Sequence, residues 1–542
     1  MAAGLPVVVS TVHAVQIGWE PTDDKGIIAT RAYDVLTAHS PLVGQYSEAG
    51  VVIGRATHDL GPMLYWLLAL PARLGNPEWM VVTMGIVNFA AVLATVALAR
   101  RRGGPTLMLA TAIAIPVMCM SLPAEAFHDI WNPSAALMPF LLLIFLCWSV
   151  ACGDAYLLPV AVLVASFVVQ AHLGYLAAST GMLVVALVGL AFGGRRRVPW
   201  ALTAVLVGLV CWQPAIINEV TGHPGNLTLV ARTATTSKPT LGLHVGENAV
   251  ARAVGVKPWW LIDPATRWDR KYDVAAPQSR GRMVSAIALL VALGVVAVVG
   301  VVRRRRDLAT AGAIGLILCA ALAAVAAQTP TAPVLAATVA YSLWWGSQCG
   351  MWVWLIVAWS AFLLVRALAP APARRLPAAA ALAGLAAAGA VGTAEAAAEK
   401  PDQHVALYRP ISVIDARLNR AIAPNEPIRF DGNLDVATQP VKASIRYDLV
   451  RHGDRVLSKG AWVRNGRWYE LDHHAYDATI TLTDRPRRPG RRAALLTRVG
   501  YSERGLRSSV YVWMAIAPRP PAAPSAARRA SRRHRHRARR RA

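Results

Sequence analysis

Long apolar runs recur along the first 394 residues of the chain, and they constrain its fold more than any other feature. Eleven runs of about 17–21 residues occur, at 3–19, 79–99, 105–122, 134–152, 155–171, 175–193, 199–217, 283–302, 308–327, 350–368 and 376–394. A helix of about 20 residues crosses a hydrocarbon core roughly 30 Å thick. Only 16% of the residues are charged, and the mean hydropathy is +0.41. These features predict a polytopic α-helical membrane protein with about 11 transmembrane helices.

Clusters of arginine predict the orientation of these helices. The clusters lie at 100–102, 195–197, 303–306 and 374–375, after the second, sixth, eighth and tenth runs. If eleven helices alternate in direction, all four clusters lie on one side, and the positive-inside rule makes that side cytoplasmic. We therefore expect a multi-pass plasma-membrane protein with a cytoplasmic N-terminus and an extracytoplasmic C-terminal region. The aromatic segment 331–346 is then predicted to be re-entrant or interfacial. Counting it as a further full span would place the arginine cluster at 374–375 on the outer side.

The same topology divides the chain into domains. A transmembrane domain is expected at 1–396, with long outer loops at 20–78 and 218–282. The apolar stretch 62–74 in the first loop is too short to cross and predicts an interfacial helix. Beyond the transmembrane domain, "ISVIDARLNRAI" predicts a helix. Strands are predicted at "PIRFDG", "KASIRYDLV", "RVLSKGAWV", "WYELD", "DATITLTD" and "SSVYVWMAI". They predict a small exported α+β or β-sandwich domain at 400–517.

The net charge of +26 is concentrated outside these elements. Nine arginines fall in the last fifteen residues, within a segment, 518–542, whose composition predicts a disordered Arg-rich tail. The predicted topology places this tail outside the cell. Its expected contacts are therefore membrane lipid or envelope polymers, and no nucleic acid partner is expected.

The first outer loop carries an acidic pair directly after the first apolar run. The stretch "EPTDDKGIIATRAYDVL" contains Asp23, Asp24 and Arg31, and the same loop continues to Arg55 and His58. A carboxylate can act as a general base or hold a divalent metal, and arginine and histidine can neutralise a phosphate. An acidic pair can equally serve only to keep the loop in water, and residue types alone do not separate these roles.

Two further stretches at predicted outer ends combine polar and aromatic side chains. They are "AEAFHDIWNP" and "QAHLGY". Carboxylates and amides bond to sugar hydroxyls, and an aromatic ring can stack on a sugar's C–H face. The candidate substrate-binding residues are His128, Asp129, Trp131, Asn132, His172 and Tyr175.

The order of these features resembles the GT-C superfamily of membrane glycosyltransferases. The local sequence motifs are similar to those of an actinobacterial group of membrane proteins. That group is related to the dolichyl-phosphate-mannose mannosyltransferase and aminoarabinose transferase families. The matching stretches are "DDKGIIATRAYDVL", "SPLVGQYS", "HDLGPMLYWLLALP", "WNPSAALMPFLLLIFLCWSVACGD" and "QAHLGY", within residues 1–370. The sequence departs from the group in its short first helix and in reading Asp-Asp-Lys-Gly where a single acid followed by small residues is commoner.

This resemblance implies a reaction. A sugar would move from a polyprenyl-phosphate donor to an extracytoplasmic lipid, glycan or protein acceptor of the cell envelope, with inversion and without ATP. Asp24, or else Asp23, would be the general base, and Arg31, Arg55 and His58 would stabilise the departing phosphate. No cofactor is required by the motifs, although Asp24 is also compatible with a divalent metal.

Two other classes fit the apolar runs. One is a transporter or flippase of lipid-linked sugars, and the other is a non-catalytic scaffold of the cell envelope. Transporters commonly place ionisable residues within their spans, whereas the runs here carry almost no charge away from their ends. Convergence of Asp24, His58, His128 and His172 on one outward-opening cavity would favour the enzyme.

Overall fold

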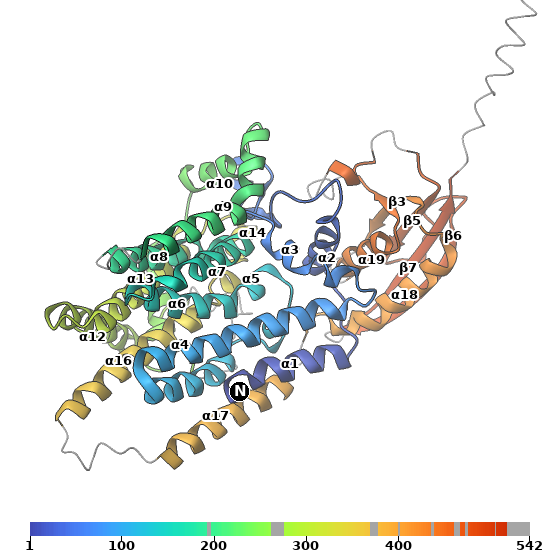
Figure 1. Ribbon diagram of the computed structural model, residues 1–542. Coiled ribbons are helices and arrows are strands. Elements are labelled where there is room, and N and C mark those ends of the chain that lie inside the picture. The colour runs from blue at the N-terminus through green and yellow to red at the C-terminus, as the bar shows by residue number, and fades with distance from the viewer. Residues whose placement is uncertain are drawn as a thin grey trace, which may run out of the picture. The chain divides into compact units, whose positions relative to one another are not determined.

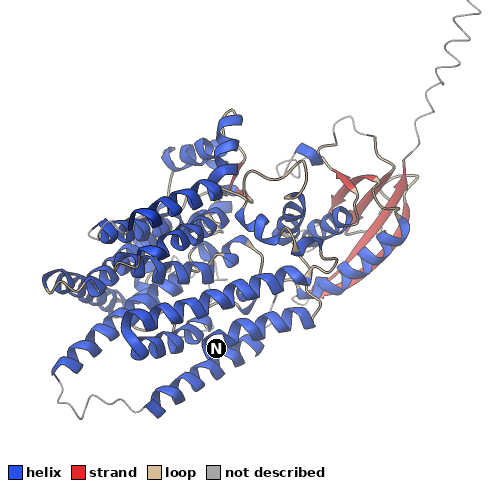
Figure 2. Cartoon of the chain, viewed as in Figure 1, coloured by secondary structure: helices blue, strands red, loops and turns tan. Residues whose placement is uncertain are grey.

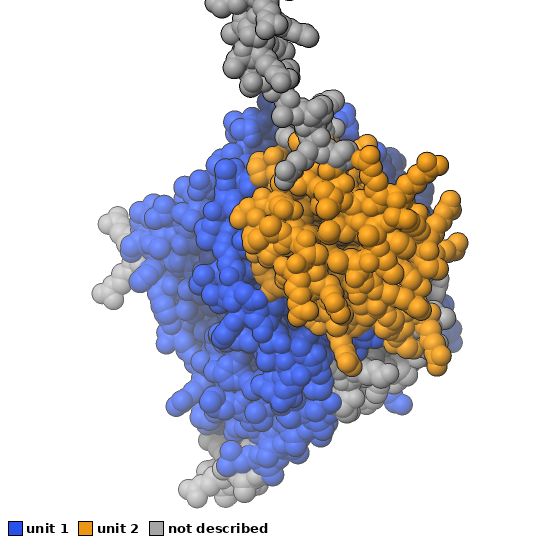
Figure 3. All heavy atoms as spheres, turned by 90° about the vertical axis from the view of Figure 1, so that its right-hand side faces the viewer, with its two compact units in different colours: residues 1–408 blue, residues 409–542 orange. Residues whose placement is uncertain are grey.

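The computed structural model describes residues 1–191, 197–261, 276–368, 378–398, 402–434, 438–459, 467–471, 475–503 and 506–517. The chain divides into two compact units, Met1–Tyr408 and Arg409–Ala542, coloured separately in Figure 3. The predicted tail at 518–542 lies outside the described residues. Residues 402–408 group with the first unit, so the segment that follows the last apolar helix belongs to the helical part of the chain.

The first unit consists mainly of long apolar helices (Figure 1). Their bounds are α1 Leu5–Gln16, α4 Glu78–Cys119, α6 Leu137–Ala151, α7 Leu158–Ala171, α8 Leu176–Ala191, α9 Val198–Thr221, α12 Arg280–Val302, α13 Arg306–Gln328, α16 Gly346–Leu368 and α17 Ala378–Ala398. The 42-residue α4 is broken at Gly104, whose φ of 68° no L side chain adopts easily, and Pro105 follows. Its two halves correspond to the predicted runs 79–99 and 105–122. Each of the eleven predicted runs therefore overlaps a helix.

Among the described residues, seven segments are long and apolar enough to cross a membrane, and three shorter apolar helices accompany them. Helix α6 is apolar on every side, and it packs against α4, α7 and α8, so nearly all its residues are buried. Peripheral helices instead expose large apolar side chains, for example Leu202 and Leu209 of α9 and Val291 and Val298 of α12. In a multi-pass membrane protein this exposed apolar surface is the part that meets lipid.

Short elements connect the long helices at the end of the bundle that carries the candidate site. They are α2 Asp24–Asp34, β1 Tyr46–Ser47, β2 Thr57–His58, α3 Met63–Leu68, α5 Asn132–Ala135, α10 Asn226–Thr235, α11 Leu243–Val254, α14 Pro333–Ala336 and α15 Val339–Ser342. The predicted interfacial helix at 62–74 is two pieces, α3 and a 3₁₀ turn at Pro71–Arg73. The predicted re-entrant segment at 331–346 contains the two short helices α14 and α15, and α16 follows directly.

The second unit contains a five-stranded sheet in the order β4-β3-β5-β7-β6 (Figure 2). Its strands are β3 Pro427–Asn433, β4 Arg455–Leu457, β5 Ala478–Thr483, β6 Ala494–Glu503 and β7 Leu506–Ile516. Strand β3 runs parallel to β4 and β5, and β7 is antiparallel to β5 and β6. The predicted helix at "ISVIDARLNRAI" is present as α18 Tyr408–Ala421. With α19 Gln439–Arg451, the unit is of the α+β type, and the β-sandwich alternative is set aside.

Two strand predictions in this unit were wrong. The described part of "WYELD", residues 468–471, forms a 3₁₀ turn and a single bridge residue instead of a strand. The run "KASIRYDLV" lies in helix α19, with Pro440 in its first turn. Helix α19 connects β3 to β4, which pair in parallel. Parallel neighbours need a crossover between their ends, and a helix usually provides it. The strand-like composition of this run was overridden by the topology of the sheet.

Candidate functional site

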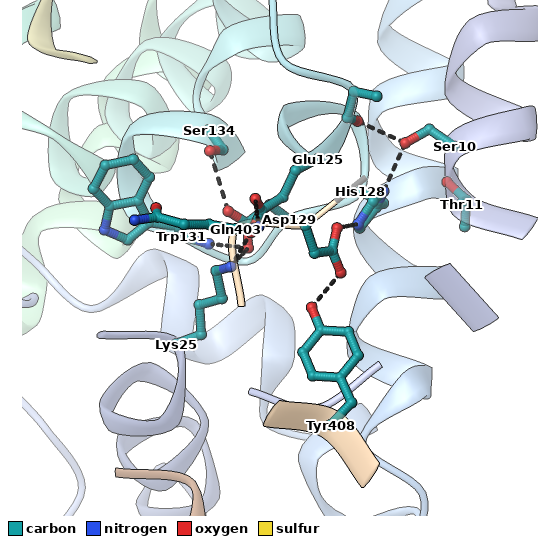
Figure 4. Close-up of polar contacts among 12 residues, drawn as sticks. Ser10, Thr11, Lys25, Glu125, His128, Asp129, Trp131, Ser134, Gln403 and Tyr408 are labelled. Atoms are coloured by element: carbon teal, nitrogen blue, oxygen red, sulfur yellow. Dashed lines mark hydrogen bonds and ion pairs between the residues drawn. The ribbon is translucent and has the colours of Figure 1, made fainter. Parts of the chain in front are cut away.

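A partly open pocket with a cavity volume of about 90 Å³ lies in the first unit. Segments far apart in the sequence line it: the turn before α2, the stretch before α5, the residues before α16 and the segment after α17. The lining residues are Thr22, Asp23, Asp24, Lys25, Pro123, Glu125, Ala126, Asp129, Trp131, Ser134, Trp344, Gln403 and His404. Part of this constellation is drawn in Figure 4.

Asp23 and Asp24 lie where α2 begins. Asp24 is the first residue of the helix, a favourable position for a carboxylate because the helix dipole is positive there. Asp23 precedes it with a φ of 51° and a ψ of −129°, which is a strained backbone for a residue with a side chain. Strain of this kind tends to persist where the surrounding structure enforces it, often at functional sites. The turn therefore holds both carboxyl groups at the pocket.

The Asp24 carboxyl group is oriented by two side chains. The indole Nε1–H of Trp131 donates to Asp24 Oδ2 at 3.2 Å, and the Gln45 amide nitrogen donates to Oδ1 at 3.4 Å. Gln45 is itself held because the Tyr65 hydroxyl donates to its Oε1 at 3.2 Å. Each Asp24 oxygen has a further lone pair, so the group can still accept a proton from a ligand.

Burial changes the proton affinity of both acids. Burial, together with the negative charge of Asp24, raises the pKa of Asp23 to about 6, although Lys25 opposes the shift. Burial also raises the pKa of Asp24, and the hydrogen bonds from Trp131 and Gln45 limit this rise. Carboxyl groups with raised pKa values are better matched to proton transfer near neutral pH than ordinary ones.

Lys25 is buried beside the two acids. Its ammonium group forms an ion pair with Glu125, and its Nζ lies 3.8 Å from Asp129 Oδ1. Burial alone would lower the pKa of Lys25, but the charges of Asp129, Glu125 and Asp402 outweigh it, and the pKa is raised. Burial likewise raises the pKa of Asp129 to about 7, against the opposing charge of Lys25. A buried cation thus sits within a group of carboxyls at the pocket wall.

Aromatic rings form another part of the wall. Trp131 and Trp344 both line the pocket, in an edge-to-face arrangement with ring centroids 5.7 Å apart. The Tyr341 ring packs against Trp131 with a centroid distance of 4.7 Å. The Asp129 carboxylate fixes the backbone beside Trp131, because the Trp131 N–H donates to its Oδ1 at 3.1 Å. This wall offers ring faces and edges next to hydrogen-bonding groups, a combination that suits a sugar.

His128 is fully buried and lies behind the pocket. Its Nδ1 is 2.7 Å from Ser10 Oγ, and its Nε2 is 3.1 Å from Asp402 Oδ1. The Tyr408 hydroxyl donates to the other oxygen of Asp402. Burial alone would raise the pKa of Asp402, but the hydrogen bond and charge of His128 reverse the shift and lower it. His128 therefore anchors the residues that follow α17.

The predicted phosphate-binding residues do not line this pocket. Arg31 is paired with Asp34 at 2.5 Å, Arg55 is exposed, and the His58 ring packs on Tyr46 while its backbone N–H donates to Asn226. Four of the six sugar-binding candidates also lie outside its lining, namely His128, Asn132, His172 and Tyr175. Asn132 donates to Asp59 at 2.9 Å.

His172 and Tyr175 occupy structural positions near the same end of the bundle. His172 Nδ1 accepts from the Gly174 N–H at 3.1 Å, and its ring lies 6.1 Å from that of Tyr341. The buried Tyr175 hydroxyl donates to the Pro133 carbonyl at 3.0 Å. Of the predicted residues, the pocket brings together Asp23, Asp24, Asp129 and Trp131.

Several pocket residues were not among the candidates chosen from the sequence. Lys25 follows the acidic pair directly, and that adjacency was the available signal. Glu125 lies in the same outer stretch as Asp129. Trp344, Gln403 and His404 carry no motif, and only the folding of distant segments brings them here.

A divalent metal at Asp24 was left open by the sequence. In the described part of the chain, no three His, Cys, Asp or Glu side chains are grouped so that they could hold a metal ion. At the pocket the Lys25 ammonium occupies the space between Glu125 and Asp129, and Asp24 accepts from Trp131 and Gln45. The residues present do not form a metal-binding set, and no step below uses one.

Comparisons with known proteins bear on the fold. No protein-family model matches the chain, and no curated protein matches its sequence. The crystal structure of ArnT from Cupriavidus metallidurans bound to undecaprenyl phosphate is similar to it, with a TM-score of 0.51 and 14% identity. The match covers 94% of this chain and 97% of that chain. The chain therefore shares the overall fold of that structure.

Proposed function

We propose that this protein is an integral-membrane glycosyltransferase. It transfers a sugar from a polyprenyl-phosphate donor to a hydroxyl group of a lipid, glycan or protein of the cell envelope, with inversion at the anomeric carbon. The observation that carries the proposal is the pocket at the start of α2, where Asp23 and Asp24 meet aromatic rings. The fold shared with ArnT, a protein crystallised with undecaprenyl phosphate, supports the same class of donor.

Asp24 is proposed as the general base. The acceptor oxygen bonds to the anomeric carbon while its proton passes to Asp24, and the bond from that carbon to the phosphate oxygen breaks on the opposite face. A base must be held within hydrogen-bond reach of the proton, and the bonds from Trp131 and Gln45 fix the carboxylate. Asp23 is the alternative base, because it lines the same pocket and its pKa is about 6.

The departing phosphate needs a positive charge nearby. Lys25 lines the pocket, whereas Arg31, Arg55 and His58 do not. We therefore assign to Lys25 the stabilisation of negative charge as the phosphate leaves. The sugar ring would rest on Trp131 and Trp344, and the carboxylate of Asp129 would accept from its hydroxyls.

The sidedness of the pocket is part of the proposal. The loop between the two halves of α4 and the loop after α6 meet where Arg101 and Arg102 pair with Asp154. The arginine clusters follow alternate spans, and the pocket is built from segments at the other ends of these helices. The positive-inside rule then puts the arginines in the cytoplasm and the pocket outside.

The convergence expected of an enzyme is met in part. Asp24 lines the pocket, but His58, His128 and His172 do not. We prefer an enzyme to a transporter because the groups that converge are carboxyls, and they line a pocket at one end of the helix bundle. Direct assay separates the two classes.

The test is sugar transfer by the purified full-length protein in lipid nanodiscs. A panel of radiolabelled polyprenyl-phosphate sugars is supplied with extracted envelope acceptors. We expect Asp24→Asn to reduce transfer by about 10²–10⁴-fold, the usual effect of removing a general base. Glu48→Gln, an exposed acid of the same loop outside the pocket, is the matched control and should keep full activity.

Asp23→Ala in the same assay identifies which acid acts as the base. If Asp24→Asn and Asp23→Ala both transfer sugar at the wild-type rate, neither acid is the general base. Movement of lipid-linked sugar across the bilayer without any transfer would favour the transporter.

A further inference from the structure

The buried contacts around His128 have no part in the proposed reaction, yet both of its ring nitrogens have a polar partner. Ser10 has one hydroxyl proton, and it is donated to the Ala124 carbonyl at 2.6 Å. His128 Nδ1, 2.7 Å from the same Ser10 oxygen, must therefore carry a proton and donate it. Nε2 faces Asp402 at 3.1 Å. His128 therefore bridges Ser10 and the Asp402 carboxyl inside the first unit.

The His128–Asp402 contact is the first of three contacts that hold the short segment starting at Asp402. The Tyr408 hydroxyl donates to the second oxygen of Asp402. The backbone N–H of Gln403 donates to Glu125 Oε2 at 2.8 Å, and Glu125 is also the partner of Lys25. The segment that starts at Asp402 is thus tied to the residues before α5 and, through Glu125, to the start of α2 (Figure 4).

The segment that these contacts hold places two side chains at the pocket. Gln403 and His404 both line it, and Gln403 is exposed there. Four of the other lining residues carry carboxyls, which accept hydrogen bonds when ionised, and Lys25, Thr22 and Ser134 bring donors of their own. An amide and an imidazole add N–H donors. A ligand with both hydroxyl protons and bare oxygens, as a sugar has, is matched only when both kinds of group are present.

We infer that Gln403 and His404 contact the transferred sugar and determine which sugar is accepted, and that His128 and Asp402 are positioning residues that hold them in place. This inference rests on the proposed glycosyl transfer. It assigns a substrate-selecting role to a segment far from the motifs of the first loop, and it gives the buried His128–Asp402 contact beside the pocket a function.

The test uses polyprenyl-phosphate sugars that differ from the preferred donor at one hydroxyl each. For Gln403→Ala and His404→Ala, we expect the preference for the natural sugar over one such analogue, measured as a ratio of kcat/KM, to fall about 3- to 10-fold. That range corresponds to the loss of one hydrogen bond. Val405→Ala, next along the chain, 36% exposed and outside the pocket lining, is the matched control and should leave every ratio unchanged.

The positioning role is tested with His128→Asn and Asp402→Asn. Both should raise KM for the donor more than they lower kcat, and both should speed amide hydrogen exchange in a peptide covering residues 402–408. A purely structural role would reduce the folded fraction equally for all sugars without changing their ranking. If either variant does not fold, Gln403→Ala and His404→Ala still decide the inference.

The two failures are distinguishable. An active wild type whose sugar ranking is the same in Gln403→Ala and His404→Ala would overturn this inference and leave the proposed function intact. A wild type that transfers no sugar from any donor would overturn the proposed function and this inference with it.

Discussion

Two polar hollows, one in each unit, carry charge in opposite ways. The pocket of the first unit gathers Asp23, Asp24, Glu125 and Asp129 around the buried Lys25. A hollow on β6 and β7 of the second unit is lined by arginines and tyrosines, and Arg498 and Arg507 there are exposed. Arg498 lies over the Tyr511 ring at 5.3 Å.

Burial distinguishes the charged groups whose pKa suits proton transfer from those whose pKa does not. Burial shifts the pKa of Asp23 to about 6 and of Asp129 to about 7, because removing a carboxylate from water favours its neutral form. An exposed guanidinium stays hydrated, and its interactions are screened by salt. In the proposed reaction the first hollow moves a proton near neutral pH, and the second has no part in it.

The largest effect should come from removing the buried cation. Lys25→Met leaves the Glu125 and Asp129 carboxyls without their partner, and breaking a buried ion pair costs about 3–5 kcal/mol. We expect a large fall in thermal stability in detergent and loss of transfer. Lys25→Met/Glu125→Gln should recover part of the stability because it removes one unpaired charge.

Arg101→Met is the comparison for that experiment. Arg101 is 49% exposed on its side chain, and its pair with Asp154 should contribute less than about 1 kcal/mol. Equal losses of stability in Lys25→Met and Arg101→Met would contradict the distinction between buried and exposed charge.

The next effect is on the pH dependence of transfer. A carboxyl base works when it is deprotonated, so activity should rise with pH through the pKa of the base and level off above it. If Asp23 is the base, kcat/KM should fall about tenfold per pH unit below about pH 6. If Asp24 is the base, the limb should lie above the ordinary Asp value of 3.8, and it should persist in Asp23→Asn. A profile without any acid limb down to pH 4 would contradict both assignments.

A smaller effect should follow from relieving the backbone at Asp23. Its φ of 51° is strained for a residue with a Cβ, by about 1–3 kcal/mol, and glycine adopts it freely. We expect Asp23→Gly to be more stable in thermal unfolding than Asp23→Ala, which differs from it only by the methyl group. Retained transfer in both variants would assign the base to Asp24. A lower stability for Asp23→Gly would show that the strain is absent.

The smallest effect should come from the arginine hollow. Arg498→Gln should change transfer by less than about twofold, because an exposed charge in the second unit has no part in the proposed reaction. The measurement is the same assay at low and physiological salt. A tenfold loss would give the second hollow a role in binding substrate and would remove the contrast between the two.

The sequence predicted the membrane fold well because spanning a bilayer depends on local properties. A run of about 20 apolar residues is sufficient, whichever helices surround it. The break at Gly104 could also be anticipated from the glycine and proline between two runs. Helix α19 could not be anticipated, because whether its run forms a helix or a strand depends on β3 and β4 pairing in parallel.

The site was predicted less completely, for a physical reason that particular residues make clear. Asp23 and Asp24 follow an apolar run directly, so the sequence alone identified them and the kind of surface they occupy. Lys25 meets Glu125 across 100 residues, and Gln403 meets Glu125 across 278. Composition determines which segments enter a membrane, whereas the proton affinities and partners of polar groups depend on which distant segments are packed together. Only the tertiary structure decided that Lys25 would be buried among acids and that a segment beyond the last apolar helix would complete the pocket.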